Sequence, residues 1–232
     1  MKFSTELGQF LLGDSRKLIK ELPSASVDVI LTDPPFGLRM DEYDDPEVFF
    51  ELEDEMWRVL KPNSWLVFYY ATKKLPEAFR LKRFRYVWQI CCLFFGPKSV
   101  TKCSLGDQLY QIVLVFAKGK PKVTNRRSDV IYGEILPSIS FKIKDPQFKP
   151  TLANAMLLQM FSKEGDLILD PFAGFGSIPL TCEVMGRRWI AFEIDPLKFE
   201  VSHKFMVERR PVSVRTKPLT KITEGGLEKY LE

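Results

Sequence analysis

Apolar and polar positions along the chain follow two different periods, and the two kinds of segment alternate. Continuous runs of β-branched and aromatic residues predict buried strands. These runs occupy residues 27–31, 65–70, 86–95, 109–116, 167–169 and 189–192. Apolar residues at helical spacing predict helices at residues 16–22, 47–60, 151–161, 177–185 and 197–207. Strands that alternate with helices indicate an α/β fold with a doubly wound sheet, formed by a single domain over residues 1–232.

Three parts of the chain depart from this simple alternation. The runs at 86–95 and 109–116 are joined by a polar linker with two glycines and a proline, so we expect an antiparallel pair and a mixed sheet. Residues 118–148 are basic, interrupted by prolines and without a clear period, which predicts an inserted target-recognition segment. Residues 211–232 are expected to form a polar C-terminal tail.

Composition narrows the class of protein. The chain is 45% hydrophobic and 28% charged, which is typical of globular proteins. It has no run of 18 apolar residues and no apolar secretory segment near its start, so we expect a cytoplasmic protein without a membrane anchor. The four cysteines form no CxxC pair, and His203 is the single histidine. These counts argue against histidine-based zinc sites and hydrolases with a catalytic histidine, and no metal is expected.

Charge is distributed unevenly along the chain, although the formal net charge is only +4. Residues 41–55 contain nine acids and no Lys or Arg. Residues 73–127 contain thirteen Lys or Arg and two acids. We therefore expect two opposed surfaces, an acidic one that stays away from phosphates and a basic one that faces an anionic polymer.

The clearest chemical signal follows the predicted strand at 167–169, where the chain reads DPFAGFGS before a helix. Gly174 and Gly176 let the backbone approach a ligand closely, and the helix amino terminus favours a carboxylate. Asp170 is expected to face a ligand's ammonium group, and Glu193 to accept hydrogen bonds from ribose hydroxyls. The motif lacks the third glycine of dinucleotide-binding loops and the lysine of phosphate-binding loops. Its spacing alone does not separate dinucleotides from S-adenosylmethionine.

A second turn, Asp33-Pro34-Pro35-Phe36, comes directly after the first predicted strand. Ligands of doubly wound sheets bind at the carboxyl ends of strands, so we expect this turn to lie beside Asp170, 137 positions further on. The prolines fix the backbone and leave the Asp33 carboxylate and the Pro34 carbonyl oxygen as two acceptors. Two acceptors suit an exocyclic amino group, whose lone pair is otherwise delocalised into its ring. Phe36 offers a stacking face for a flipped base.

In this order, the two motifs resemble those of the amino-group DNA methyltransferases of the beta group, which use S-adenosylmethionine. DPPF resembles their catalytic DPPY motif, and DPFAGFGS resembles their DPFxGxGT cofactor motif, with Phe175 and Ser177 in place of the commoner Ser and Thr. Four other stretches are similar to the family: LLGDSRKLIKELPSASVDVILTDPPF, RVLKPNSWLVF, YQIVLVFAKGKP and FKPTLANAMLLQMF. The resemblance covers residues 9–120 and 148–205, and it implies a Rossmann-like, circularly permuted methyltransferase fold.

The resemblance also implies roles for individual residues. The catalytic motif consists of Asp33 and Pro34, which hold the amino group, together with Pro35 and the stacking ring of Phe36. The residues implied in cofactor binding are Asp14, Asp33, Lys149, Pro150, Thr151, Asp170, Pro171, Phe172, Ala173, Gly174, Gly176, Ser177, Glu193, Ile194 and Asp195. The residues expected to contact phosphates of double-stranded DNA are Lys98, Lys102, Lys120 and Lys122.

The activity implied is methyl transfer to N6 of adenine in DNA, because an Asp opens the catalytic motif where cytosine-N4 enzymes more often have Ser. Cytosine-N4 methylation, RNA amino-methylation, a non-catalytic DNA-binding module and an NAD-binding oxidoreductase remain as alternatives. The short segment before Lys149 suggests a small target site, relaxed specificity or a missing partner. A restriction endonuclease partner and a homodimer are both left open.

Overall fold

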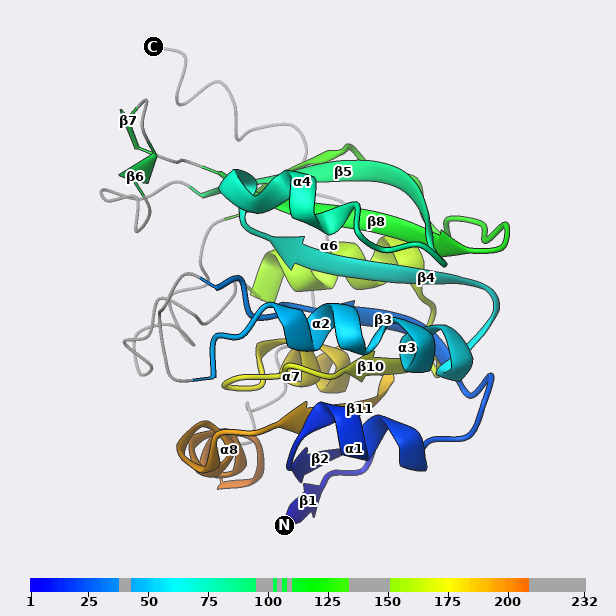
Figure 1. Ribbon diagram of the computed structural model, residues 1–232. Helices are drawn as coiled ribbons and strands as arrows, with labels where there is room; N and C mark the ends of the chain where they lie inside the picture. The colour runs from blue at the N-terminus through cyan, green and yellow to red at the C-terminus, as the bar shows by residue number, and fades with distance from the viewer. Residues whose placement is uncertain (38–42, 95–101, 104–105, 108–109, 134–150, 209–232) are drawn as a thin grey trace.

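The computed structural model describes residues 1–37, 43–94, 102–103, 106–107, 110–133 and 151–208. Within these residues, nine strands form one sheet in the order β1-β2-β11-β10-β3-β4-β8-β5-β9 (Figure 1). The strands are β1 (Lys2–Ser4), β2 (Gly8–Leu12), β3 (Val27–Thr32), β4 (Leu60–Tyr70), β5 (Arg85–Phe94), β8 (Tyr110–Lys118), β9 (Val130–Gly133), β10 (Leu167–Asp170) and β11 (Arg188–Glu193). A separate ribbon pairs β6 (Lys102–Cys103) with β7 (Gly106–Asp107).

Five neighbouring strands of the sheet run in parallel. Parallel pairing joins β2, β11, β10, β3 and β4. β8 is antiparallel to both β4 and β5, and β9 pairs in parallel with β5. The carboxyl ends of the five parallel strands therefore lie at one edge of the sheet, on the left in Figure 1, which we term the site edge.

Helices cover both faces of the sheet and produce three layers (Figure 1). One face carries α1 (Ser15–Leu18), the turn Ile19–Glu21, α2 (Glu47–Glu51), α3 (Glu53–Val59), the turn Thr72–Lys74 and α4 (Leu75–Ala78). The other face carries α6 (Thr151–Phe161), α7 (Ser177–Val184) and α8 (Pro196–His203), which continues as the turn Lys204–Glu208. None of the described helices is both long and apolar enough to cross a bilayer.

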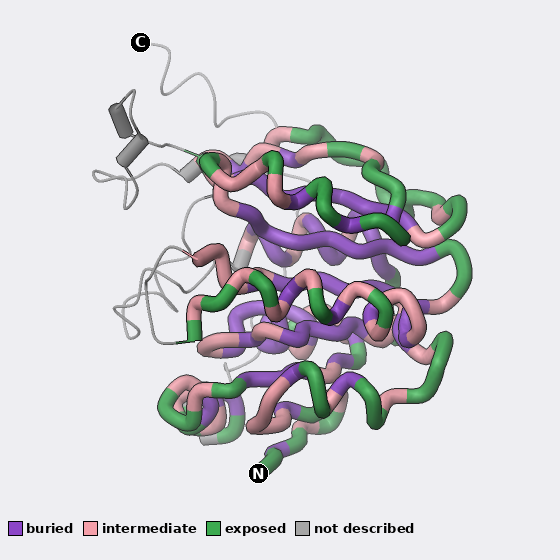
Figure 2. Tube along the Cα trace, viewed as in Figure 1, coloured by how far each residue is buried: buried purple, intermediate pink, exposed green. Residues whose placement is uncertain are grey.

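The central strands are buried on both sides, as the continuous purple tube in Figure 2 shows. In β4, Val67 and Tyr69 belong to the apolar cluster beneath α6, whereas Phe68 and Tyr70 belong to the cluster beneath α2 and α3. Burial on both faces explains why such strands read as continuous apolar runs rather than as an alternation. The predicted doubly wound, mixed α/β sheet is confirmed.

Three predicted elements differ from the structure. The helix expected at 47–60 is interrupted at Leu52, where a ψ of −4° opens the helical turn between α2 and α3. The following strand begins at Leu60, five residues earlier than predicted, because Leu60 already pairs with Val27 of β3. The described part of the predicted recognition segment, residues 118–133, contains β9. This strand has four residues, too few to give a recognisable hydrophobic period in the sequence.

The acidic and basic stretches of the sequence contact one another instead of forming two separate surfaces. Glu47 of α2 forms a two-oxygen salt bridge with Arg80, at 2.6 and 2.7 Å. Glu53 of α3 accepts the backbone N–H groups of Lys82 and Arg83, each at 2.7 Å. The expectation of two opposed surfaces is therefore wrong for this part of the chain, because the turn after α4 brings its basic residues back over the acidic helices.

Candidate functional site

Three loops meet at the site edge, and each begins where a parallel strand ends. β3 ends at Thr32 and continues into residues 33–36, which we term the DPPF turn. β10 ends at Asp170 and continues into residues 171–176, the glycine turn, and β11 ends at Glu193. Because β3, β10 and β11 are consecutive in the sheet, the two motifs lie side by side as predicted.

A buried hydrogen bond links the strands that carry the two turns. The hydroxyl of Thr32 donates to Oδ1 of Asp170 at 2.7 Å, and the N–H of Phe172 donates to the same oxygen at 3.2 Å. Asp170 is 2% exposed. Burial raises the pKa of its carboxyl to about 7, although both hydrogen bonds lower it. Asp170 thus joins the ends of β3 and β10, and its contact with a ligand's ammonium group stays a prediction.

Backbone geometry accounts for both glycines of the glycine turn. Gly176 has a φ of +79° and directly precedes α7, and a Cβ there would lie 3.3 Å from the ring of Phe10. Gly174 has a φ of +54°, and a Cβ built on it meets nothing within 4 Å. Glycine adopts such backbone conformations without strain. The empty space beside Gly174 therefore leaves its backbone open to a ligand.

Glu193 closes the glycine turn from the neighbouring strand. Its Oε2 accepts the N–H of Gly174 at 2.6 Å, and its Oε1 accepts the N–H of Asp195 at 2.8 Å. Burial raises the pKa of Glu193 above its usual value, although these N–H groups act in the opposite direction. Each carboxylate oxygen has a further lone pair, so Glu193 can hold the turn and also accept hydrogen bonds from a ligand. Ile194, which is 40% exposed, follows it at the surface.

Asp14 begins α1 and is paired with a cation. Its Oδ1 accepts the N–H of Arg16 at 2.9 Å, and the guanidinium of Arg16 forms a salt bridge with it at 2.9 Å. The hydrogen bonds from Arg16 lower the pKa of Asp14. The adjacent Ser15 donates to the carbonyl oxygen of Pro171 at 2.5 Å, which fastens α1 to the glycine turn. The predicted contact of Asp14 with the adenine of a cofactor remains a prediction.

The DPPF turn is held through both the ring and the backbone of Phe36. Asp33 and Phe36 are half-buried. The ring of Phe36 lies edge to face against Tyr70, with ring centroids 5.7 Å apart and planes at 78°. Oδ1 of Asp44 accepts the N–H groups of Phe36 and Gly37, each at 2.8 Å. The turn therefore holds a fixed aromatic ring three residues after Asp33.

Sequence reasoning missed several polar residues at the site edge, among them Thr32, Asp44 and a buried pair beneath the turns. In this pair, the Tyr69 hydroxyl donates to Oδ1 of Asn154 at 2.7 Å, and both residues have 0% exposure. Burial raises the pKa of Tyr69, and the charge of nearby Asp33 contributes to this shift. A polar residue within an apolar run is the only sequence signal for Thr32 and Asn154, and it does not reveal their partners.

Two of the four lysines predicted to contact DNA lie at the far edge of the sheet. Lys120 and Lys122 follow β8 at the far edge, because Lys118 pairs with Ser64 near the start of β4. The β4 residues from Ser64 to the site edge at Tyr70 span about 20 Å. The N–H of Lys120 also donates to Oδ1 of Asn63 at 2.9 Å. Lys120 and Lys122 therefore do not belong to the site edge, and we leave them out of the DNA contact proposed below.

Other predicted residues are only partly described. Lys98, Lys149 and Pro150 lie outside the described residues, Thr151 is the first residue of α6, and Lys102 lies in β6. The remaining members of the glycine motif that are buried are Pro171, Ala173 and Ser177.

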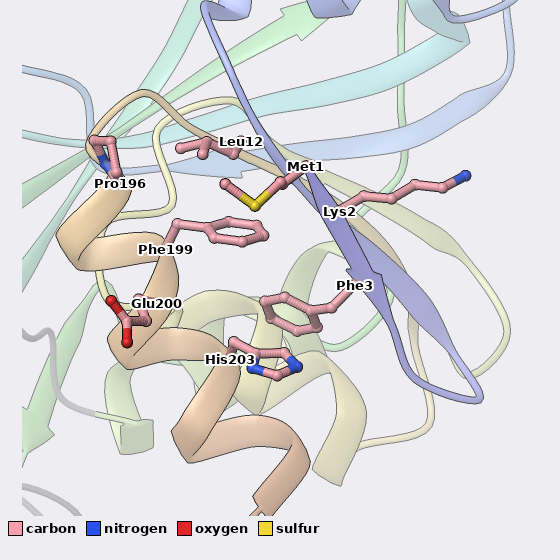
Figure 3. Close-up of a pocket in the computed structure, with 8 residues that line it drawn as sticks. All are labelled: Met1, Lys2, Phe3, Leu12, Pro196, Phe199, Glu200 and His203. Carbon is pink, nitrogen blue, oxygen red and sulfur yellow. The ribbon is translucent and has the colours of Figure 1, made fainter.

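A largely apolar hollow of about 380 Å³ lies between β1, β2 and α8 (Figure 3). It borders the site edge, because Leu12 pairs with Glu193 and Pro196 follows Asp195. His203 packs edge to face against Phe3 there, with centroids 5.0 Å apart. The residues that line it are Met1, Lys2, Phe3, Leu12, Pro196, Phe199, Glu200 and His203.

Family models match two parts of the chain. Residues 139–204 match the family described as DNA methylase, and residues 7–102 match the family described as RMKL-like, methyltransferase domain. Among curated relatives, the Type II methyltransferase M.BamHI of Bacillus amyloliquefaciens is 28% identical over 83% of this chain and 56% of its own length. The chain thus spans about half of that relative. The DNA adenine methyltransferase YhdJ of Escherichia coli is 23% identical over 84% of this chain and 81% of its own length.

Solved structures share the fold. The M1.HpyAVI–SAM complex aligns with a TM-score of 0.69 and 20% identity, over 87% of this chain and 100% of that one. The PvuII DNA methyltransferase, described as cytosine-N4-specific, aligns with a TM-score of 0.71 and 19% identity, over 89% of each chain.

Fold and site together define an α/β protein in which two loops from adjacent parallel strands form the site, and this fold is shared with the two methyltransferase structures. Within this group of folds, the motifs and the matches make the chain similar to the amino-group DNA methyltransferases.

Proposed function

We propose that the chain is an enzyme that transfers a methyl group from S-adenosylmethionine to the exocyclic N6 of adenine in DNA. One observation carries the proposal: the DPPF turn and the glycine turn leave adjacent parallel strands, which the Thr32–Asp170 hydrogen bond joins. Methyl transfer requires the donor and the acceptor nitrogen to be held close together in a fixed orientation. Two adjacent turns, one for each reactant, meet this requirement.

The glycine turn fits S-adenosylmethionine through the space that it leaves. A Cβ at Gly174 would meet nothing within 4 Å, so the backbone can approach the cofactor closely. Glu193 would accept hydrogen bonds from the ribose hydroxyls, and the amino end of α7 favours the carboxylate. The further residues proposed to hold the cofactor are Asp14, Lys149, Pro150, Thr151, Asp170, Phe172, Ile194 and Asp195. When bound, the cofactor supplies a methyl group on a positively charged sulfur.

The DPPF turn would prepare the amino group for transfer. The Asp33 carboxylate and the Pro34 carbonyl oxygen would accept hydrogen bonds from its two N–H groups. These bonds would localise the lone pair on the nitrogen and reduce its delocalisation into the ring. The nitrogen would then be ready to accept the methyl group that a bound cofactor supplies, with the thioether as leaving group, and Asp33 would take one amino proton and pass it to water. Phe36 stacks on the base outside the double helix.

Transfer to N4 of cytosine is a second candidate function. It is supported by the likeness of the chain to the PvuII enzyme, which is described as cytosine-N4-specific. Both reactions need the same pair of acceptors for an amino group, so the base differs while the mechanism at Asp33 is shared. The Asp that opens the motif favours adenine.

Double-stranded DNA is the proposed partner. Lys102 and the neighbouring Lys98 belong to the connection between β5 and β8, and both strands meet this connection at the site edge. We propose that these two lysines bind phosphates of the DNA. A cytoplasmic location is proposed with this substrate.

Methylated nucleosides identify the reaction directly. The protein is incubated with DNA and S-adenosylmethionine, the DNA is digested, and the nucleosides are identified by mass spectrometry. We expect N6-methyladenine from the wild type and a loss of at least about 100-fold in the Asp33→Ala variant, because the nitrogen loses an acceptor. Calorimetry should show that Asp33→Ala weakens S-adenosylmethionine binding far less than it slows transfer, since Asp33 is one of many residues implied in cofactor binding and the glycine turn remains intact.

The other outcomes are also decisive. N4-methylcytosine in place of N6-methyladenine would replace the proposed base and retain the mechanism. Methylated RNA with unmodified DNA would replace the substrate. Wild-type protein that binds the cofactor but methylates neither nucleic acid would overturn the proposal.

A further inference from the structure

A carboxylate outside both motifs holds the backbone of the DPPF turn. One oxygen of Asp44, Oδ1, accepts the N–H groups of Phe36 and Gly37, each at 2.8 Å. Gly37 has a φ of +68°, a conformation that L residues rarely adopt. A single acceptor that binds two successive N–H groups fixes the direction of both peptide units, and hydrogen bonds to a charged acceptor are stronger than neutral ones.

The core of the protein holds Asp44 in place. Asp44 lies three residues before α2, whose Phe49 is buried against Phe68 of the sheet with ring centroids 4.8 Å apart. Pro46, between Asp44 and α2, lies so close to Gly37 that a Cβ there would be 3.0 Å from its ring. The start of α2 therefore packs on the end of the DPPF turn.

The ring of Phe36 is fixed by the same arrangement. Its edge-to-face contact with Tyr70 depends on the backbone direction at Phe36, which the bond from its N–H to Asp44 sets. Phe36 is only half-buried, so part of its ring remains available for stacking. Backbone and ring are thus both oriented before any ligand binds.

On the basis of the function proposed above, we propose that Asp44 is a positioning residue for methyl transfer. It sets the backbone of Phe36 so that the ring is already oriented to stack on the flipped base. Asp44 itself does not contact the substrate. The requirement is for an acceptor oxygen at this position rather than for a negative charge.

Three variants separate the acceptor from the charge. Asp44→Ala removes both. Asp44→Asn removes the charge and keeps an amide oxygen that can accept the two N–H groups. Asp45→Ala is the matched control, because it removes the same charge from the next residue, whose Oδ1 accepts only the N–H of Glu47 at the start of α2.

The assay uses a DNA duplex in which methylation by the wild type has been mapped, and a second duplex with fluorescent 2-aminopurine at the methylated base. For Asp44→Ala we expect kcat to fall about 10- to 100-fold, as for misplaced catalytic groups, with a smaller flipping signal. The Kd for S-adenosylmethionine should stay within about twofold, because the glycine turn is unchanged. Asp44→Asn should recover most of kcat, and Asp45→Ala should match the wild type.

Several outcomes would contradict the inference. These are wild-type kcat in Asp44→Ala, an equal loss in Asp44→Asn, or loss of cofactor binding together with kcat in Asp44→Ala. The last result would indicate general unfolding. Wild-type protein without any methyl transfer would refute the proposed function as well, whereas an active wild type with an unaffected Asp44→Ala refutes this inference alone.

Discussion

Carboxylates at the site edge differ in role because their surroundings differ. Asp170 is buried and bonded to Thr32, so it joins two strands. Glu193 is bonded to backbone N–H groups on both oxygens and shapes the glycine turn. Asp33 is half-buried in the DPPF turn, for which we propose a catalytic role. Three acids within one small region thus have three different surroundings.

The burial of Asp170 predicts a specific dependence of stability on pH. Its pKa is about 7 in the folded protein, above the ordinary aspartate value of 3.8, so between these values the unfolded state binds fewer protons than the folded state. The free energy of unfolding should therefore fall as pH rises from about 4 to about 7, by no more than about 4 kcal/mol from this group. Asp170→Asn keeps an oxygen for Thr32 and cannot ionise, so this contribution should vanish.

Urea denaturation at a series of pH values measures this effect. Burial also raises the pKa of Glu193, which lowers the free energy of unfolding with rising pH in the wild type and in Asp170→Asn alike. The difference between the two proteins therefore isolates the contribution of Asp170. Parallel curves for the two proteins from pH 4 to pH 7 would show that Asp170 does not titrate as expected.

At the scale of elements, the motifs were predictable and their supports were not. The strands before both turns are continuous apolar runs, and glycines and prolines mark the turns, so sequence alone locates Asp33 and Gly174. Thr32 and Asn154 bind partners that are distant along the chain. Asp44 binds residues that are near in sequence, but their spacing matches no known motif. The break at Leu52 was also missed, because helical periodicity continues across it.

The glycine turn provides the prediction at this scale. Gly174→Ala places a methyl group in the space proposed for the cofactor, and it also strains a residue with φ of +54°. Gly165→Ala is a matched control, because Gly165 has φ of +80°, no atom within 4 Å of its Cβ position, and a place before β10 at the opposite edge. Each should lose about 1–2 kcal/mol of stability. Only Gly174→Ala should weaken S-adenosylmethionine binding, by about tenfold or more.

Thermal unfolding and calorimetry measure these two quantities independently. Equal cofactor affinities in Gly174→Ala and Gly165→Ala would show that the cofactor does not approach Gly174.

For the whole molecule, the sheet separates two edges with different surroundings. The site edge carries the DPPF turn, the glycine turn and Glu193. The opposite edge carries Lys120 and Lys122. On one face of the sheet, acidic side chains of α2 and α3 bind the basic residues that follow α4. Charge counted along the sequence could not reveal this arrangement, because contacts such as Glu47–Arg80 join stretches 33 residues apart.

DNA binding distinguishes the two edges. Lys98→Ala with Lys102→Ala should weaken binding at low salt and reduce the salt slope of the binding constant by about 2, one unit for each lost phosphate contact. Lys120→Ala with Lys122→Ala removes the same charge at the far edge and should leave both quantities unchanged. The measurement is fluorescence anisotropy across a salt series, and equal losses in the two double variants would contradict the edge assignment.

The parallel pairing of β9 with β5 has a consequence for the connection that follows it. β9 ends at Gly133 beside Phe94, and α6 begins at Thr151 and leads back to the start of β10. The connection between β9 and α6 thus leaves and re-enters the described fold at the site edge. The pairing of β9 with β5 and the packing of α6 on the sheet fix these two attachment points. A connection of another length or sequence can therefore join the same two points without a change in strand register.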